Sequence, residues 1–157
     1  MAIQVNDDRM TVSFAGAPQV YLYGAIDAGA PQRFEALVKS GKIPAGSDVY
    51  LNASQGDLAA GLALGRLFRA GDMTTHLGTP RKGRRSGYQG SKAAVCTGAC
   101  AYAYLGGLFR WAPTGSDRIG LTLHPTTAIP DHKPAEDEVS AYLKSMDIDL
   151  EIGRAQV

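Results

Sequence analysis

The sequence lacks any long hydrophobic run. Its 157 residues contain no stretch of about eighteen apolar residues, so we expect neither a transmembrane helix nor a membrane partner. Residues 1–8 have neither the basic start nor the apolar core of a secretory signal peptide. Two alternatives therefore stay open: a cytoplasmic protein, or a chain from which a periplasmic signal peptide has been removed.

The chain also has almost no excess of charge of either sign. Its net charge of +1 gives no reason to expect a nucleic-acid partner. The exception is a local basic cluster, Arg81, Lys82, Arg84 and Arg85, which is a weak indication of phosphate groups or an acidic partner. The alternative interpretation of this cluster is a solvated loop.

Cysteine and histidine are scarce. The two cysteines are Cys96 and Cys100, with no histidine or further cysteine at ligand spacing, so we predict no metal site and no cofactor. Helix neighbours one turn apart are about 5–6 Å apart at Cβ, whereas a disulfide needs about 3.5–4.5 Å. A bridge is therefore possible only if Cys96 precedes the helix, and the pairing stays open. His76 and His132 carry no supporting motif and are expected on the surface or in loops.

The length and the hydrophobic pattern predict one domain, residues 1–157, without repeats or linkers. Strands and helices alternate, which predicts an α/β fold with parallel βαβ units. Gly61 and Gly65 lie inside a predicted helix, where small residues indicate close approach of another backbone. The predicted strands are 10–14, 20–23, 48–52, 73–77 and 118–124; the predicted helices are 30–40, 57–70, 98–108 and 134–145; and 78–91 is a predicted loop.

Three segments together resemble the Clp protease/crotonase superfamily. Residues 49–58 (VYLNASQGDL) resemble its strand–turn–helix element, and residues 96–102 (CTGACAY) resemble the element that presents the nucleophile. Residues 121–125 (LTLHP) resemble the strand end that carries the general base. The second segment is most similar to a bacterial periplasmic Clp-like branch that reads Cys-x-Ser-Ala-Cys. The resemblance implies a ββα-spiral, Clp/crotonase-like single domain.

The resemblance also implies roles for individual residues. A serine peptidase needs a hydroxyl at a helix start, a histidine base and backbone N–H groups aimed at the oxyanion. The nucleophile position is Gly98, which has no side chain, and the base position is His124. The N–H groups of Ala99 and of Gln55 or Gly56 correspond to the oxyanion hole.

Two departures from the family pattern affect this interpretation. Gln55 stands where the family usually has a glycine. The third member of the triad is not identified, because Asp147, Asp149 and Glu151 match the relevant family segment poorly.

The leading hypothesis is a catalytically impaired Clp-protease-like protein that binds a peptide or protein partner through the vestigial active-site groove. One alternative is an active serine hydrolase whose nucleophile is altered or relocated, for example to Ser54, Ser86 or Ser91. Another alternative is a crotonase-type acyl-CoA enzyme, which needs an oxyanion hole but no serine.

The resemblance further implies a homo-oligomer, since members of the superfamily usually self-associate. Leu108, Phe109 and Trp111 are candidates for a contact surface, and a place in the core is the alternative for them.

Overall fold

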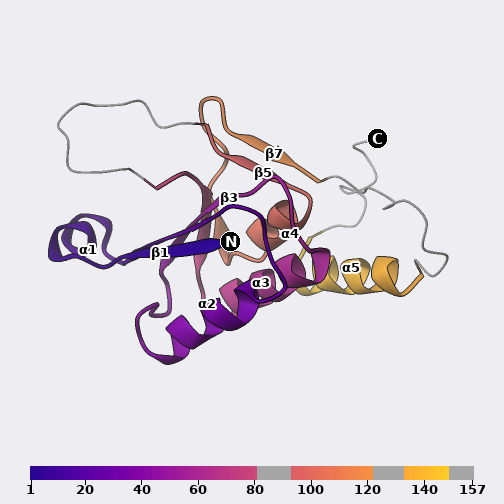
Figure 1. Cartoon of the computed structure of the whole chain (residues 1–157), viewed down its shortest axis with the longest axis horizontal. Helices are drawn as coiled ribbons and strands as arrows, with labels where there is room; N and C mark the ends of the chain where they lie inside the picture. Colours follow the sequence, from indigo (N-terminus) through magenta and orange to yellow (C-terminus); the bar gives the residue numbers. More distant parts are fainter. Residues whose placement is uncertain (81–92, 122–132, 149–157) are drawn as a thin grey trace.

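The chain folds as an α/β structure with a mainly parallel sheet, as the sequence predicts. The computed structural model describes residues 1–80, 93–121 and 133–148, with side chains from residue 138 in the last range. Figure 1 shows α1 at one end of the molecule and α5 at the other. The elements are β1 (Ala2–Asn6), α1 (Arg9–Ala15), β2 (Gln19–Tyr23), α2 (Ala30–Lys39), β3 (Asp48–Asn52), α3 (Leu58–Ala70), β4 (Thr74–Leu77), β5 (Val95–Thr97), α4 (Ala99–Leu105), β6 (Phe109–Arg110), β7 (Arg118–Gly120) and α5 (Lys133–Ser145).

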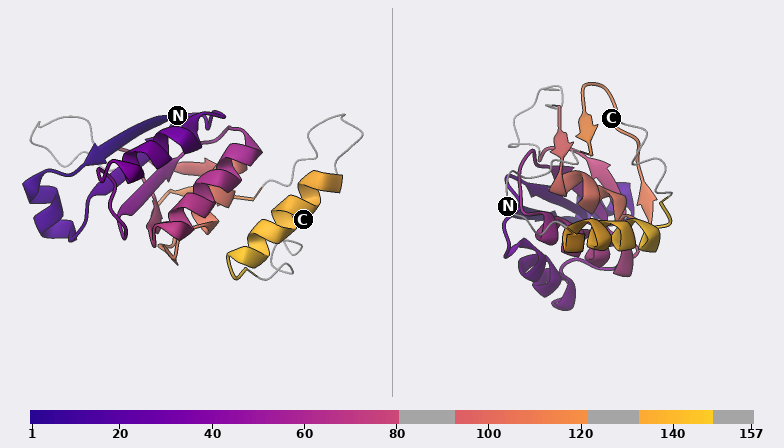
Figure 2. Two further views of the ribbon diagram at one scale, coloured as in Figure 1. Left: turned by 90° about the horizontal axis from the view of Figure 1, so that it is seen from below. Right: turned by 90° about the vertical axis from the view of Figure 1, so that its right-hand side faces the viewer.

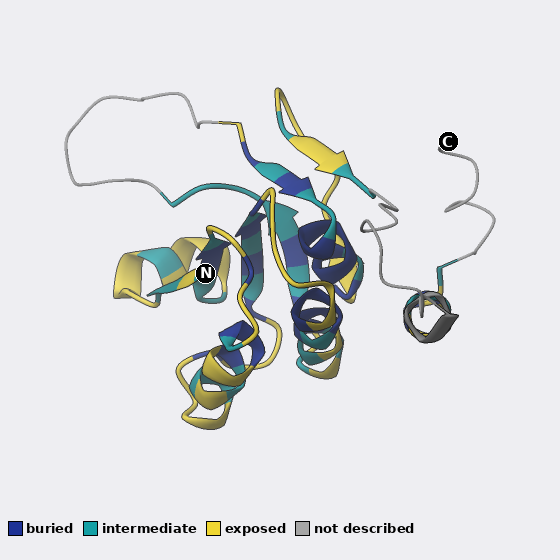
Figure 3. Ribbon diagram, turned by 45° about the vertical axis from the view of Figure 1, so that its right-hand side comes forward, coloured by how far each residue is buried: buried dark blue, intermediate teal, exposed yellow. Residues whose placement is uncertain are grey.

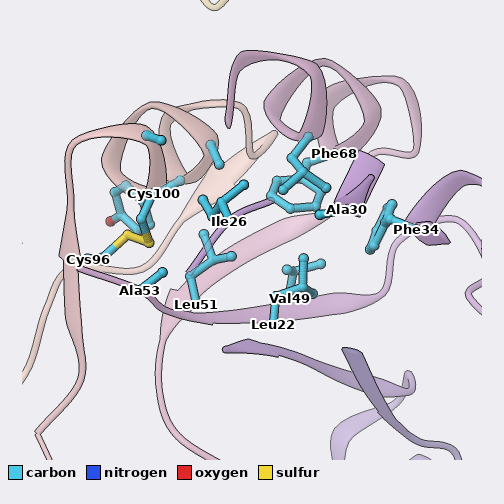
Figure 4. Close-up of a cluster of buried hydrophobic side chains, with 14 of the residues drawn as sticks. Leu22, Ile26, Ala30, Phe34, Val49, Leu51, Ala53, Phe68, Cys96 and Cys100 are labelled. Carbon is cyan, nitrogen blue, oxygen red and sulfur yellow. A yellow bond between two sulfur atoms is a disulfide. The ribbon is translucent and has the colours of Figure 1, made fainter. Parts of the chain in front are cut away.

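The main sheet has the strand order β1-β2-β3-β4-β6, and only β1 runs antiparallel to its neighbour. Side chains alternate between its two faces. Val20 and Leu22 on β2 and Val49 and Leu51 on β3 are fully buried beneath α2, α3 and α4. Figure 4 shows this core, and Figure 3 shows that α2 and α3 keep their outer faces exposed. The parallel βαβ units therefore form as predicted.

A smaller parallel pair, β5 and β7, joins the main sheet near the carboxyl end of β3. The backbone of Cys96 on β5 forms an isolated parallel β-bridge with Ala53, the residue directly after β3. The predicted strand 118–124 begins as expected at Arg118, and its last three residues lie outside the described ranges. The predicted basic loop lies largely outside them as well. Strands β1, β5 and β6 were not predicted.

The prediction of a strand over residues 10–14 is wrong, because this segment is helix α1. The Asp8 carboxylate accepts hydrogen bonds from the N–H and hydroxyl of Thr11 at 3.0 and 2.6 Å, which caps the helix start. Gly16 ends the helix with φ of 75°. The alternating apolar residues suggested a buried strand face, but Met10 and Phe14 are 70% and 88% exposed.

Helices α3 and α4 pack with their backbones almost in contact, as the glycines predicted. A Cβ on Gly61 would overlap the backbone carbonyl of Ala99. A Cβ on Gly106 would overlap the Cα and carbonyl of Gly65. Glycine is therefore required here for space, and these contacts fix where α4 begins relative to α3.

A second hydrophobic cluster, separate from the core beneath the main sheet, forms where helix α5 packs against α3 and α4. In it Tyr142 packs with Leu62 and Tyr102. Figure 2 shows α2, α3 and α5 in succession along the molecule. The buried Tyr142 hydroxyl donates to the carbonyl of Tyr102 at 2.5 Å, and its ring lies beneath the Arg66 guanidinium, 5.5 Å away. This ring reaches the α3 backbone because Gly65 has no side chain there.

Alkaline pH is expected to loosen the α5 contact. Burial raises the pKa of Tyr142 well above its ordinary value. An unfolded tyrosine ionises near about pH 10, so this contribution to stability is complete below that pH and is lost as the pH rises further. We expect the melting temperature to fall more steeply above about pH 10 in the parent chain than in Tyr142→Phe, measured by circular dichroism. Tyr23→Phe, at a partly exposed position, is the control. Identical alkaline profiles for all three chains would contradict this assignment.

Candidate functional site

The junction between β5 and α4 places Gly98 at a sharp turn. Gly98 is the N-cap of α4, with φ of 58° and ψ of −124°, a conformation that L-residues rarely adopt. Its N–H donates to the carbonyl of Gly120 at 3.0 Å, and its carbonyl accepts from Tyr102 at 3.2 Å. Strained strand-to-helix turns of this kind hold catalytic nucleophiles in hydrolases. Here the residue at the turn is Gly98, which has no side chain and therefore no hydroxyl.

The second part of the site is the turn between β3 and α3. Asp57 caps α3 by accepting from the N–H of Ala60 at 2.9 Å. The turn is held to Ile26, whose N–H donates to the carbonyl of Gln55 at 3.0 Å and whose carbonyl accepts from Asp57 at 2.8 Å. A Cβ at Gly56 would lie 2.5 Å from the Ile26 Cβ, so only glycine fits. The turn is therefore rigid although its residues are exposed.

Thr97 and Asn52 tie these two parts together. The N–H and hydroxyl of Thr97 donate to the carbonyls of Ala53 and Ser54, each at 3.1 Å. The Asn52 side-chain oxygen accepts from the N–H of Val95 at 3.0 Å. Sequence reasoning missed both residues, although each is a polar residue within or next to a quoted motif.

Backbone donors remain available at this junction. Within the described ranges, no acceptor pairs with the N–H groups of Ala99, Gln55 or Gly56. Ala99 is the first residue of α4 and is 6% exposed, whereas the two turn residues are exposed. An unpaired N–H is a ready donor to a carbonyl or an anionic oxygen.

A shallow hollow of about 340 Å³ adjoins the turn. It lies where β2 and β3 end, and ligands of open α/β sheets bind at the carboxyl ends of strands. Its lining is mixed apolar and polar, and consists of Gly24, Ala25, Asn52, Ala53, Ser54, Gln55 and Val95. A hollow with this lining can hold a small side chain and can form hydrogen bonds with a polar group beside it.

Cys96 and Cys100 form a disulfide that brackets Gly98. Cys96 lies on β5 and precedes the helix, which is the condition that the sequence set for a bridge. Both residues are fully buried at one end of the core, as Figure 4 shows. The bridge joins β5 directly to the first turn of α4.

Removing this disulfide is expected to lower stability. A bridge that closes so short a loop stabilises by about 2 kcal/mol in the chain-entropy description. We expect Cys96→Ala/Cys100→Ala to lower the free energy of unfolding by about that amount, measured in urea. The parent chain treated with reductant is the matched comparison, and should lose the same amount. An unchanged unfolding midpoint in both would contradict a structural role.

The structure places Gly98 and Ala99 at the start of α4 and Gln55 and Gly56 in the β3–α3 turn, and Thr97 links these two segments. His124, together with Ser86, Ser91, His132, Asp149 and Glu151, lies outside the described ranges. Asp147 is 91% exposed and lies 3.9 Å from Arg69 on α3, so it pairs away from the junction.

His76 is not the loop or surface residue that the sequence suggested. It lies in β4, and its side chain is only 16% exposed. Its Nε2 lies 2.9 Å from the Asp48 carboxylate. Among the residues that the structure covers, no group of three or more potential metal ligands occurs, and no helix is long and apolar enough to cross a membrane.

No protein-family model and no curated protein matches this chain. A solved structure does: the chain is similar to an alanine-for-serine variant of the 1510-N membrane-bound stomatin-specific protease, with a TM-score of 0.52 and 17% identity. The match covers 80% of this chain and 59% of that one, so the chain spans under two thirds of that protein's length. At this identity the likeness shows the fold alone, an α/β fold with a mainly parallel sheet.

Proposed function

We propose that this chain is a non-catalytic Clp-like protein that binds an extended peptide or protein segment beside Gly98. The observation that carries the proposal is the glycine itself, which occupies a strained strand-to-helix turn and has no hydroxyl. Without a nucleophile the first step of acyl transfer has no attacking atom. Within this proposal His124 is a remnant of the general base.

The neighbouring groups support binding rather than chemistry. The N–H groups of Ala99, Gln55 and Gly56 serve as donors to a backbone carbonyl of the bound segment. The hollow at Ala25 and Ser54 accepts a small side chain next to that carbonyl. Thr97 and the disulfide keep these groups in place in the absence of ligand, which lowers the entropic cost of binding.

The disulfide also supports a compartment. Such bridges persist in oxidising compartments and are rare in the cytosol. We therefore propose that the chain functions in an oxidising compartment such as the periplasm. We further propose that it belongs to the periplasmic Clp-like branch, with glycine in place of serine, and assembles as a homo-oligomer, as members of this superfamily usually do. Thiol titration of the denatured, unreduced protein should find no free thiol at Cys96 or Cys100.

Fluorescein-labelled casein tests binding and hydrolysis in one sample, because casein is an unfolded polypeptide. We expect its anisotropy to rise with the concentration of the parent chain, without release of acid-soluble fluorescence. Ala25→Phe fills the hollow and should weaken binding at least about tenfold, the scale of one lost side-chain pocket. Ala28→Phe, at an exposed position outside the lining, is the matched control.

Several outcomes would overturn the proposal. Release of fluorescence, or labelling of the parent chain by a serine-reactive fluorophosphonate, indicates an active hydrolase, and Ser54→Ala then identifies the nearest candidate. Absence of casein binding removes the binding role. A rise in the melting temperature of the chain, measured with acyl-CoA at a concentration well above its dissociation constant, favours the crotonase alternative instead.

A further inference from the structure

An aromatic row crosses the main sheet on the face opposite the helices. Tyr21, Tyr50, His76 and Trp111 come from β2, β3, β4 and the residue after β6, and successive ring centroids lie 4.8, 4.5 and 5.7 Å apart. The rings are nearly parallel, with interplanar angles of 19°, 14° and 14°. The strand register produces the row, since Tyr21 pairs with Tyr50 and Tyr50 with His76.

The row ends at the edge of the sheet. One side of β6 pairs with β4, and no described strand pairs with its other side. The ring of Trp111 stacks on His76 and is nevertheless 62% exposed, so its outer face is open. Phe109 lies two residues earlier, on the same face by strand alternation, and is 66% exposed.

The edge is held rigidly. The N–H of Trp111 donates to the carbonyl of Thr75 at 2.9 Å, and its carbonyl accepts from the Tyr104 hydroxyl at 2.7 Å. A charged side chain on an edge strand often prevents pairing with another strand. Here the Arg110 guanidinium does not cover the edge, because it donates to the carbonyls of Leu105 and Met146, both at 3.0 Å. The backbone N–H and carbonyl of Arg110 face away from β4 and have no partner among the described residues. The edge is therefore preformed, and it offers these two groups to a further strand.

We infer that this edge binds an extended segment of a separate polypeptide that carries an aromatic side chain. Adjacent strands lie about 4.8 Å apart, so a strand added to β6 continues the row by one step. The residue opposite Trp111 is then placed against the open face of the indole, and a residue two positions away lies near Phe109. The ring-on-ring contact selects an aromatic residue, and the alternate position selects an apolar one.

A second copy of this chain is the less favoured occupant. The exposed apolar surface of Leu108, Phe109 and Trp111 is on the order of 350 Å². A stable dimer needs about 800 Å² from each partner. A peptide strand needs less, because backbone hydrogen bonds to the edge supply part of the binding. This site is independent of the hollow near Gly98.

The probe is a fluorescein-labelled peptide with the core valine-threonine-tyrosine-threonine-valine, which reads the same in both strand directions. We expect it to bind about threefold to tenfold more tightly than the same peptide with leucine at the centre, which is the range for one aromatic pair. Trp111 is the one tryptophan of the chain, so its emission should change on binding of the unlabelled peptide. A version with proline in place of both threonines should bind more weakly, because proline has no N–H to donate and restricts the extended backbone.

Trp111→Leu tests the stacking contact. It keeps an apolar side chain, and we expect the preference for tyrosine over leucine to fall to about one while far-ultraviolet circular dichroism stays unchanged. Ala25→Phe should leave the affinity for this peptide unchanged, so failure here and failure of casein binding are distinguishable. Three results would overturn the inference: no binding at millimolar peptide, a tyrosine preference that survives in Trp111→Leu, or a concentration-dependent dimer in sedimentation that excludes the peptide.

Discussion

The Gly106→Ala variant is expected to melt roughly 10 °C below the parent chain. The new methyl group would overlap the Cα and carbonyl of Gly65 on α3, and backbone atoms cannot rotate away as a side chain does. Overpacking costs about 1–3 kcal/mol, and a backbone obstacle places this case at the upper end. For a chain of this size each kcal/mol lowers the melting temperature by about 2–4 °C. Thermal melts followed by circular dichroism give the measurement.

The matched control is Gly120→Ala. Among the described residues, its Cβ would meet nothing nearer than the Thr97 methyl at 3.4 Å, an ordinary contact. Neither Gly106 nor Gly120 has a positive φ, so both changes avoid backbone strain. The control should melt within about 2 °C of the parent chain, as changes outside tightly packed contacts do. Equal melting temperatures for Gly106→Ala and the parent would show that α3 and α4 are free to separate.

This contact also reaches the candidate site. Ala99, the first residue of α4, has its carbonyl against Gly61 on the same α3 helix. A shift of α4 away from α3 therefore moves the Ala99 N–H relative to the β3–α3 turn. We therefore expect Gly106→Ala to bind casein more weakly than the parent chain, even at temperatures well below the melting temperature of the variant.

The sequence predicts the buried elements best. The strand predicted over 48–52 and the helix predicted over 30–40 match β3 and α2 closely, because burial imposes a regular apolar period on both. The segment 10–14 shows the limit of this reasoning. Its period is that of a strand, but no face of it is buried, so the caps at Asp8 and Gly16 decide the structure instead.

The short strands and the contacts between distant segments were beyond the sequence. Strand β6 has two residues and exists because β4 is beside it. The same holds in the site, where Thr97 and the carbonyl of Ser54 are 43 residues apart in the chain. Local pattern shows a polar residue but not its distant partner. The motifs single out Gly98, Ala99, Gln55 and Gly56 as candidates, but they do not reveal the hydrogen bonds from Thr97 that link the two segments.

The Gly98→Ser variant is expected to gain reactivity that the parent chain lacks. The seryl oxygen would stand at the strand-to-helix turn, next to the N–H groups proposed as the oxyanion hole. General-base activation contributes about 10²–10⁴-fold, so we expect casein hydrolysis at least about a hundredfold above the parent background. The variant should also be labelled by a fluorophosphonate, as resolved by mass spectrometry. Adding His124→Ala should abolish both signals if His124 is the base.

Backbone strain is the main opposing effect. A side chain at φ of 58° costs about 1–3 kcal/mol, so the variant is expected to melt several degrees lower. Gly98→Ala carries the same strain without the hydroxyl and is the matched control; it should melt like Gly98→Ser and remain unreactive. If Gly98→Ser is folded by circular dichroism yet unlabelled and inactive, the surrounding groups do not form a hydrolase site. The resemblance to serine peptidases would then extend to the fold and not to the chemistry, because restoring the missing hydroxyl at position 98 would not restore hydrolysis.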